Sequence, residues 1–223
     1  MLTYLFLALA AYIVYTALGG APMLRMDRRN PAVATKNKIE ELSQYAQRLK
    51  QDKKFFVAEK IFLQILKLDH KHVPTYTHLG LLYSAVKNYA DAIECFQIAA
   101  RLQPSGATYY NLGLGYYENR NFVKAIAAFE KANMFEPALQ RYLALAKAHE
   151  KMGNTEKTLD ALRQASELDD TGRVLKALAA ALRNHGRLDE LREVQEKLHT
   201  LSAKHPRAKV LPKAKAIKVE KAS

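Results

Sequence analysis

The sequence predicts an all-α fold, an array of antiparallel helix pairs preceded by one N-terminal transmembrane helix. Two observations carry this prediction. Residues 73–105 and 106–138 are two copies of one pattern, repeated at a step of 33 residues, and residues 2–24 form a run without any charge. The alternation of apolar and polar residues that marks a β-strand is absent. A helix pair of this length cannot bury its apolar face alone, so we expect the neighbouring segments to follow the same pattern.

The uncharged run at residues 2–24 is predicted to be a transmembrane anchor. An α-helix needs about 20 apolar residues to cross the hydrocarbon core of a bilayer, and this run reaches that length. A cleaved signal peptide would carry basic residues before the apolar stretch, and none stands here. An exported protein whose signal has been removed nevertheless stays open as an alternative.

A basic linker is predicted at residues 25–38, which hold five Lys or Arg and one acid. Positive residues that flank a membrane helix stay on the cytoplasmic side. We therefore expect a single-pass membrane protein with its N-terminus outside and its repeats facing the cytosol.

The two best-formed repeats, 73–105 and 106–138, agree at many independent positions. The matching residues, in pairs, are Tyr76 and Tyr109, Leu79 and Leu112, Gly80 and Gly113, Tyr83 and Tyr116, Ala92 and Ala125, Phe96 and Phe129, Ala99 and Ala132, and Pro104 and Pro137. The first four positions share one face of a helix, and the next three share one face of a second helix. The glycines and alanines allow close helix approach, and each proline ends the second helix.

Three more repeats extend the array in both directions. Residues 39–72 form a degenerate first unit, with Ala46 in the glycine position and Phe62 in the phenylalanine position. Residues 139–171 form a fourth unit in which Leu162 replaces phenylalanine. Residues 172–203 form a leucine-rich fifth unit without aromatic residues, which we interpret as a capping pair with a polar outer face. The repeat domain therefore spans residues 39–203.

This pattern resembles the tetratricopeptide repeat: an aromatic residue before Leu-Gly, then Tyr, then Ala-x-x-x-Phe, then Pro. The resemblance implies a right-handed α-solenoid that holds other proteins on a concave face built mainly by the first helix of each pair. Some members of this family bind a C-terminal carboxylate with Lys and Asn at fixed groove positions. Asn111 matches one such position, but Ser43, Gln47 and Thr77 do not supply the basic residues. We therefore expect a different peptide-binding mode.

The predicted groove has an aromatic half and a basic half, because the core positions are already filled by Tyr76, Tyr83, Tyr109 and Tyr116. The candidate binding residues are Thr77, Leu81, Tyr110, Asn111, Leu114, Tyr117, Lys147, Arg173 and Lys176. We expect a partner peptide with its apolar side on the tyrosines and its acidic end near the lysines. Packing of the same tyrosines against the next helix pair is the alternative interpretation.

No arrangement of residues indicates an enzyme. Phosphate-binding glycine loops, H-E-x-x-H and G-x-S-x-G are all missing from the sequence. The single cysteine, Cys95, excludes a disulfide framework and a Cys-based metal site. We expect no catalytic residue, no metal and no cofactor.

A basic tail is predicted at residues 204–223, which hold seven Lys or Arg and one Glu. Such a composition does not support a packed core. Beside a membrane, anionic lipid is the expected contact, and the residues assigned to it are Arg25, Arg28, Arg29, Lys209, Lys213 and Lys215. A ribosome- or RNA-associated factor that uses this tail is the alternative. Nucleic acid is the weaker prediction because aromatic residues and arginines are scarce in the tail.

Overall fold

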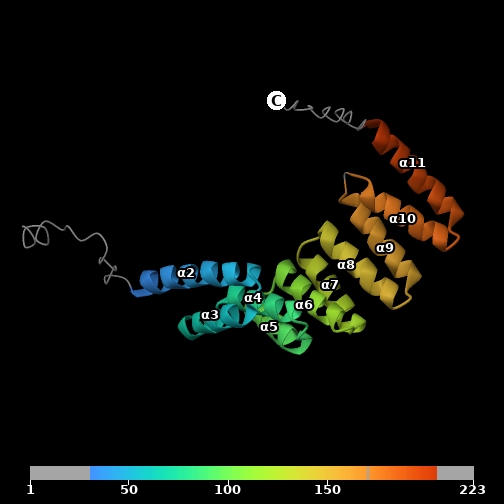
Figure 1. Ribbon diagram of the computed structural model, residues 1–223. Helices are drawn as coiled ribbons and strands as arrows, with labels where there is room; N and C mark the ends of the chain where they lie inside the picture. Colours follow the sequence, from blue (N-terminus) through green and yellow to red (C-terminus); the bar gives the residue numbers. More distant parts are fainter. Residues whose placement is uncertain (1–30, 170, 205–223) are drawn as a thin grey trace, which may run out of the picture. The chain divides into compact units, whose positions relative to one another are not determined.

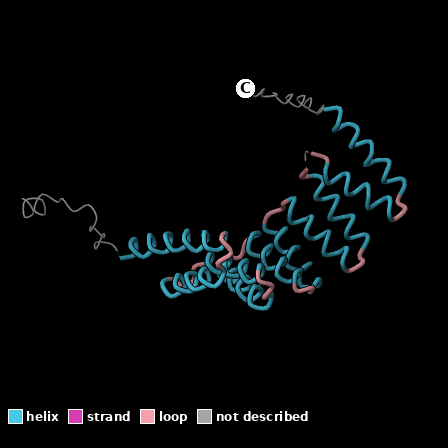
Figure 2. Tube along the Cα trace, in the orientation of Figure 1, coloured by secondary structure: helices cyan, strands magenta, loops and turns pink. Residues whose placement is uncertain are grey.

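The computed structural model describes residues 31–169 and 171–204, and these residues form helices joined by short turns. Figure 1 labels the helices, and Figure 2 shows that no strand occurs in this part of the chain. The helices are α2 (Pro31–Gln51), α3 (Phe55–Leu68), α4 (Val73–Ala85), α5 (Tyr89–Leu102), α6 (Gly106–Glu118), α7 (Phe122–Phe135), α8 (Leu139–Lys151), α9 (Thr155–Glu167), α10 (Arg173–Asn184) and α11 (Leu188–Lys204). The all-helical prediction is confirmed.

The predicted repeats coincide with helix pairs. The units at 39–72, 73–105, 106–138, 139–171 and 172–203 correspond to α2–α3, α4–α5, α6–α7, α8–α9 and α10–α11. The chain divides into two compact units, Met1–Leu102 and Gln103–Ser223, which we call unit 1 and unit 2. The described part of unit 1 holds the first two pairs and that of unit 2 the last three. Each unit has its own apolar core.

The start of the first helix differs from the prediction. Residues 31–38 were expected to belong to the linker, but α2 begins at Pro31 and includes all of them. Proline suits the first helical position because its fixed φ fits the helix and its missing N–H would have no partner there. Alanine and lysine, which follow it, are good helix formers. The linker prediction was wrong for these residues because the polarity of the segment was taken for a loop.

The predicted anchor at residues 2–24, the rest of the linker and residues 205–223 of the basic tail lie outside the described residues. Within residues 31–169 and 171–204, no helix combines the length and the apolar character needed to cross a bilayer.

The turn between the two helices of each pair contains one residue in the left-handed region. These residues are Lys53, Lys87, Arg120, Gly153 and Gly186, with φ between 58° and 71°. Their spacing follows the repeat. Glycine adopts this conformation without steric cost, whereas an L-residue with a side chain pays for it. The first three turns therefore keep the repeat geometry without glycine.

The two helices of the second and third pairs approach each other at a glycine that faces a phenylalanine ring. A Cβ added at Gly113 would lie 2.5 Å from Cδ1 of Phe129, and one added at Gly80 would lie 2.4 Å from Cε1 of Phe96. Both phenylalanines are almost completely buried. In the fourth pair the same two positions hold Ala146 and Leu162, both buried. In the first pair these positions hold Ala46 and Phe62, also buried, so alanine in the glycine position occurs with either leucine or phenylalanine opposite.

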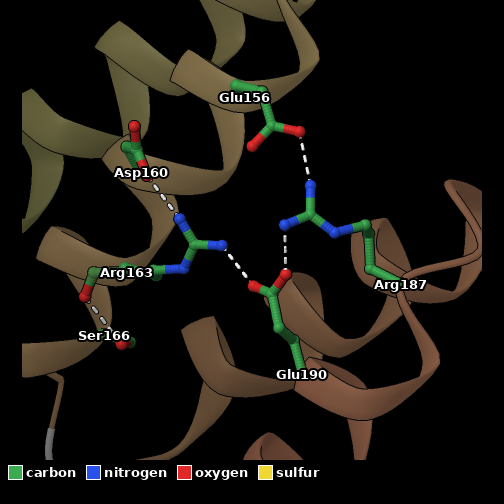
Figure 3. A network of polar contacts seen from close by, with 6 residues as sticks. All are labelled: Glu156, Asp160, Arg163, Ser166, Arg187 and Glu190. Carbon is green, nitrogen blue, oxygen red and sulfur yellow. Dashed lines mark hydrogen bonds and ion pairs between the residues drawn. The ribbon is translucent and has the colours of Figure 1, made fainter.

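The last helix pair is joined to the fourth by a network of ion pairs, shown in Figure 3. Arg163 of α9 pairs with Asp160 and Glu190, and Arg187 pairs with Glu190 and Glu156. Glu190 therefore receives two guanidinium groups, one from α9 and one from the turn before α11. Its hydrogen bond from Arg163 is the main cause that lowers the pKa of Glu190, and Arg187 adds to it. The buried apolar residues of α11 are Leu191 and Val194. The ion pairs add polar contacts to this small apolar one.

The close contact between Gly113 and Phe129 gives a testable prediction. Gly113→Ala should lower the free energy of unfolding by about 1–3 kcal/mol, because the new methyl group overlaps the ring. In a Phe129→Leu background the same change should cost less, since the fourth pair combines alanine with leucine at these positions. Urea denaturation of the two single variants and the double variant measures this coupling. Equal costs of Gly113→Ala in both backgrounds would contradict the explanation.

Candidate functional site

The candidate site is a hollow of about 290 Å³ between the first helices of the third and fourth pairs, α6 and α8. It lies entirely within unit 2. Its lining residues are Tyr110, Leu114, Tyr117 and Glu118 of α6, Phe129 of α7, and Gln140, Leu143, Ala144 and Lys147 of α8. Residues three or four positions apart on a helix share one face, which brings each of these sets to the same surface. Apolar side chains therefore form most of the lining, and polar groups stand among them.

Aromatic rings hold the α6 side of the hollow in place. The ring of Tyr110 packs against Phe129 with centroids 5.8 Å apart, and that of Tyr117 meets Phe122 edge-on at 5.4 Å. Aromatic pairs at these separations contribute about 0.5–1.5 kcal/mol beyond the area that they bury. Tyr110, Leu114 and Tyr117 are only partly buried against the core of unit 2. These side chains therefore both pack against the core and line the hollow. The alternative interpretation, that the tyrosines only pack, describes one of these two roles.

The charged groups at the edge of the hollow are available to a ligand. Lys147 and Glu118 are both exposed, and in the described part of the chain neither makes an ion pair. A lysine side chain presents a compact positive charge at the end of a flexible stem. The hollow can therefore take an apolar side chain together with a neighbouring carboxylate.

Three further hollows adjoin the first one within unit 2. Leu143 also lines a hollow of about 350 Å³ at Arg173 and Val174, and another of about 380 Å³ between α8 and α10. Tyr117 and Glu118 also line a hollow of about 420 Å³ that includes Lys151. The shared side chains make one uneven surface from α6 to α10.

The structure brings together four of the predicted groove residues, Tyr110, Leu114, Tyr117 and Lys147. Arg173 lines the adjoining hollow at the start of α10. The other predicted residues do not line these four hollows: Asn111 lies on α6, Lys176 on α10, and Thr77 and Leu81 on α4 of unit 1.

Sequence analysis did not assign Phe129, Gln140, Leu143 and Ala144 to the site. Phe129 was placed in the core, and it is indeed fully buried, yet its ring also closes the hollow. Gln140, Leu143 and Ala144 follow Ala107, Tyr110 and Asn111 at the repeat step of 33 residues. Applying the groove positions Tyr110 and Asn111 of the third repeat to the fourth would have identified Leu143 and Ala144.

Asp169 fixes the start of α10 beside Arg173. Its carboxylate accepts hydrogen bonds from the backbone N–H of Val174 at 2.7 Å and of Thr171 at 3.0 Å, and from the Thr171 hydroxyl at 2.5 Å. Burial by itself would raise the pKa of Asp169, but these hydrogen bonds and the charge of Arg173 lower it below its ordinary value. Asp169 is therefore a capping residue, and its charge is already engaged by the protein.

No group of three or more His, Cys, Asp or Glu side chains in residues 31–169 and 171–204 is arranged to hold a metal ion. Burial, with smaller contributions from Glu94, Asp91 and Glu59, raises the pKa of Cys95 to about 12. The thiolate is the nucleophilic form of cysteine, so this thiol is unreactive at neutral pH.

Known proteins share these repeats and this fold. Tetratricopeptide repeat family models match residues 78–134 and 139–171. Among curated proteins, none matches the sequence.

Several solved structures have a similar fold. A crystal structure of MamA protein superimposes with a TM-score of 0.65 at 21% identity, covering 78% of this chain and 96% of that one. MamA from Desulfovibrio magneticus gives a TM-score of 0.62 at 16% identity, covering 76% and 97%. YrrB, described as a TPR protein with an unusual peptide-binding site, gives 0.58 at 17% identity, covering 77% and 94%. At these identities the likeness establishes the fold alone.

One buried histidine on α8, His149, lies close in sequence to Lys147 but belongs to the core. It is 3% exposed, and its Nδ1 has no hydrogen-bond partner among the described residues. Tyr83 and Tyr116 occupy this position in the second and third repeats and Leu182 in the fifth. Burial lowers the pKa of His149; Glu130 opposes this effect and Lys157 adds to it.

This lowered pKa predicts that unit 2 loses stability in mild acid. Below the unfolded-state pKa of about 6.5 the unfolded chain binds a proton that folded His149 does not, so the free energy of unfolding falls as the pH decreases. His149→Leu should make the thermal midpoint less dependent on pH between 7.5 and 5. Circular dichroism melts measure this, and His199→Gln, at an exposed position of α11, is the matched control. An unchanged slope in His149→Leu would contradict the assignment.

Proposed function

The chain belongs to the tetratricopeptide repeat family, and on that premise we propose that it is a membrane-anchored scaffold that binds a segment of a partner protein. The partner segment occupies the hollow between α6 and α8, which we call the α6–α8 hollow. The repeats face the cytosol, and no catalytic step is involved. The scaffold brings its partner to the membrane surface.

The combination of Tyr110, Leu114 and Tyr117 with Lys147, which makes no ion pair with the described residues, is the observation that carries this proposal. Rings already held by Phe129 and Phe122 lose little conformational freedom when a ligand binds. Aromatic side chains in preformed hollows are frequent energetic centres of protein interfaces. An apolar side chain of the partner is therefore the main anchor, and a carboxylate near Lys147 contributes selectivity.

The partner site can be tested by photo-crosslinking in living cells. A photoreactive amino acid at Gln140, on the edge of the α6–α8 hollow, should crosslink one defined partner. The same group at Gln164, which is exposed on α9, is the matched control and should not. Tyr117→Ala should weaken partner binding at least about tenfold, as expected for an aromatic anchor.

Variant stability decides how a loss of crosslinking is interpreted. Tyr117→Phe keeps the ring and its contact with Phe122, so it should retain most of the binding. A Tyr117→Ala chain that keeps its thermal midpoint and its crosslink would contradict the proposed site. The same partner crosslinked equally from Gln164 would also contradict it.

Membrane anchoring is the second part of the proposal, and the uncharged run at residues 2–24 followed by basic residues supports it. The side chains proposed to meet anionic lipid are Arg25, Arg28, Arg29, Lys209, Lys213 and Lys215. Each basic residue at an anionic surface contributes about 1 kcal/mol. The alternatives, an exported protein and an RNA-associated factor, predict no such stable attachment.

Membrane anchoring predicts that the full chain stays in the membrane pellet after an alkaline carbonate wash. Ile13→Arg together with Val14→Arg should release it, because each arginine in the centre of a membrane helix costs about 2.5–3.5 kcal/mol. Protease added from the cytosolic side should remove the repeats. A washed pellet without the chain, or a mature N-terminus near Ala21, would favour the exported alternative.

A further inference from the structure

Two hollows of unit 2 occupy the same position in consecutive repeats. The α6–α8 hollow is lined by Tyr110, Phe129 and Ala144. A second one, which we call the α8–α10 hollow, is lined by their counterparts 33 residues later, Leu143, Leu162 and Ala177. The repeat therefore presents two equivalent places for a ligand, one after the other along the helix array.

The two hollows differ in the side chains that line them. The α6–α8 hollow, of about 290 Å³, has aromatic walls. The α8–α10 hollow is larger, about 380 Å³, because alanines lie along its α10 side, at Ala177, Ala180 and Ala181. A bulky apolar residue gains contact area on the aromatic walls, and a second apolar residue can fill the space beside the alanines.

Lys147 stands between these two places. Leu143 and Lys147 are the side chains that line both hollows, and Lys147 makes no ion pair among the described residues. Glu118 lines the first hollow and Glu150 the second, so each hollow also has one acidic group. A ligand carboxylate is attracted by Lys147 and repelled by the two glutamates, which limits it to the boundary between the hollows.

We propose that the partner segment is an extended peptide with a bulky apolar residue, then an acidic residue, then a second apolar residue three positions after the first. This proposal rests on the proposed function of the α6–α8 hollow. Packed helices lie about 8–10 Å apart, and an extended peptide advances about 3.1 Å per residue in the polyproline II conformation. Two places one repeat apart are therefore three residues apart along the peptide.

The polyproline II conformation also points these side chains toward the two hollows. It has three residues per turn, so residues i and i+3 point to the same side. The two apolar residues can then enter the two hollows together, and the acidic residue lies between them near Lys147. A basic segment such as residues 205–223 of this chain does not fit, since it holds one acid among its lysines and arginines.

The proposal can be tested by fluorescence anisotropy with the full chain and labelled synthetic peptides. One series has a single Phe and a single Asp separated by zero to five alanines, in both orders. Affinity should peak when zero or one residue separates them and should fall with longer separations. Replacing Asp with Asn should weaken the best peptide about fivefold, as for an exposed ion pair of about 1 kcal/mol.

A charge exchange at Lys147 identifies the contact. Lys147→Glu should weaken the best peptide about fivefold or more, and the matching peptide with Lys in place of Asp should recover binding to this variant. Lys157→Glu, at an exposed position of α9, is the control and should leave affinity unchanged. A peptide of residues 205–223 should bind more weakly than the Phe–Asp peptides.

The outcomes separate this proposal from the function on which it rests. If Tyr117→Ala abolishes binding while spacing and Lys147→Glu have no effect, the α6–α8 hollow is the binding site and the spacing proposal is wrong. If Tyr117→Ala leaves every affinity unchanged, or no peptide binds, both proposals are wrong. Tighter binding of the 205–223 peptide would show that the hollow prefers basic segments and would also overturn the proposal.

Discussion

The close approach of the two helices within a pair is the interaction on which the remaining structure depends. At Gly113 the backbone of α6 comes so near to Phe129 that a Cβ would lie 2.5 Å from the ring, and Gly80 has the same relation to Phe96. Because the ring is buried in this contact, it becomes a rigid support for what lies above it. Tyr110, also on α6, packs on Phe129 and forms one wall of the α6–α8 hollow. The contact that stabilises the pair therefore also shapes the candidate binding surface.

The side chains that line the hollows differ from repeat to repeat, while the helix pairs that carry them stay the same. These differences give each hollow its own chemical character. The position of Tyr110 becomes Leu143 one repeat later, Leu114 becomes Lys147, and Tyr117 becomes Glu150. Each exchange leaves the helix in place, since these side chains stand at the surface where packing is least demanding. The change at Phe129 is of another kind. Leu162 is smaller and is accompanied by Ala146 in place of glycine, whereas the first pair combines Ala46 with Phe62. The core positions therefore stay small on one side of the contact and apolar on the other, while the surface positions change in chemistry.

The sequence was sufficient to predict the helix pairs, because the residues that form them recur at a fixed step and at helical spacing. It was also sufficient to identify Tyr110, Leu114, Tyr117 and Lys147, which the fold brings to one hollow. It did not reveal the first turns of α2, since a proline suits both a loop and a helix N-terminus. It did not reveal the role of Phe129 in the site either, because periodicity assigns a residue to one face and cannot show that a buried ring also borders a hollow.

The polar groups without partners show where the repeats are least well packed. Asn133 is 8% exposed, neither atom of its amide has a hydrogen-bond partner among the described residues, and the second repeat has Ala100 at this position. A buried polar group without a partner costs about 1–3 kcal/mol. His149, on the neighbouring helix α8, has the same deficiency. At the other end of unit 2, α11 depends on ion pairs that salt screens. Unit 2 is therefore held least securely at its edges and at these two buried positions, while the glycine–phenylalanine contact keeps the α6–α8 hollow preformed.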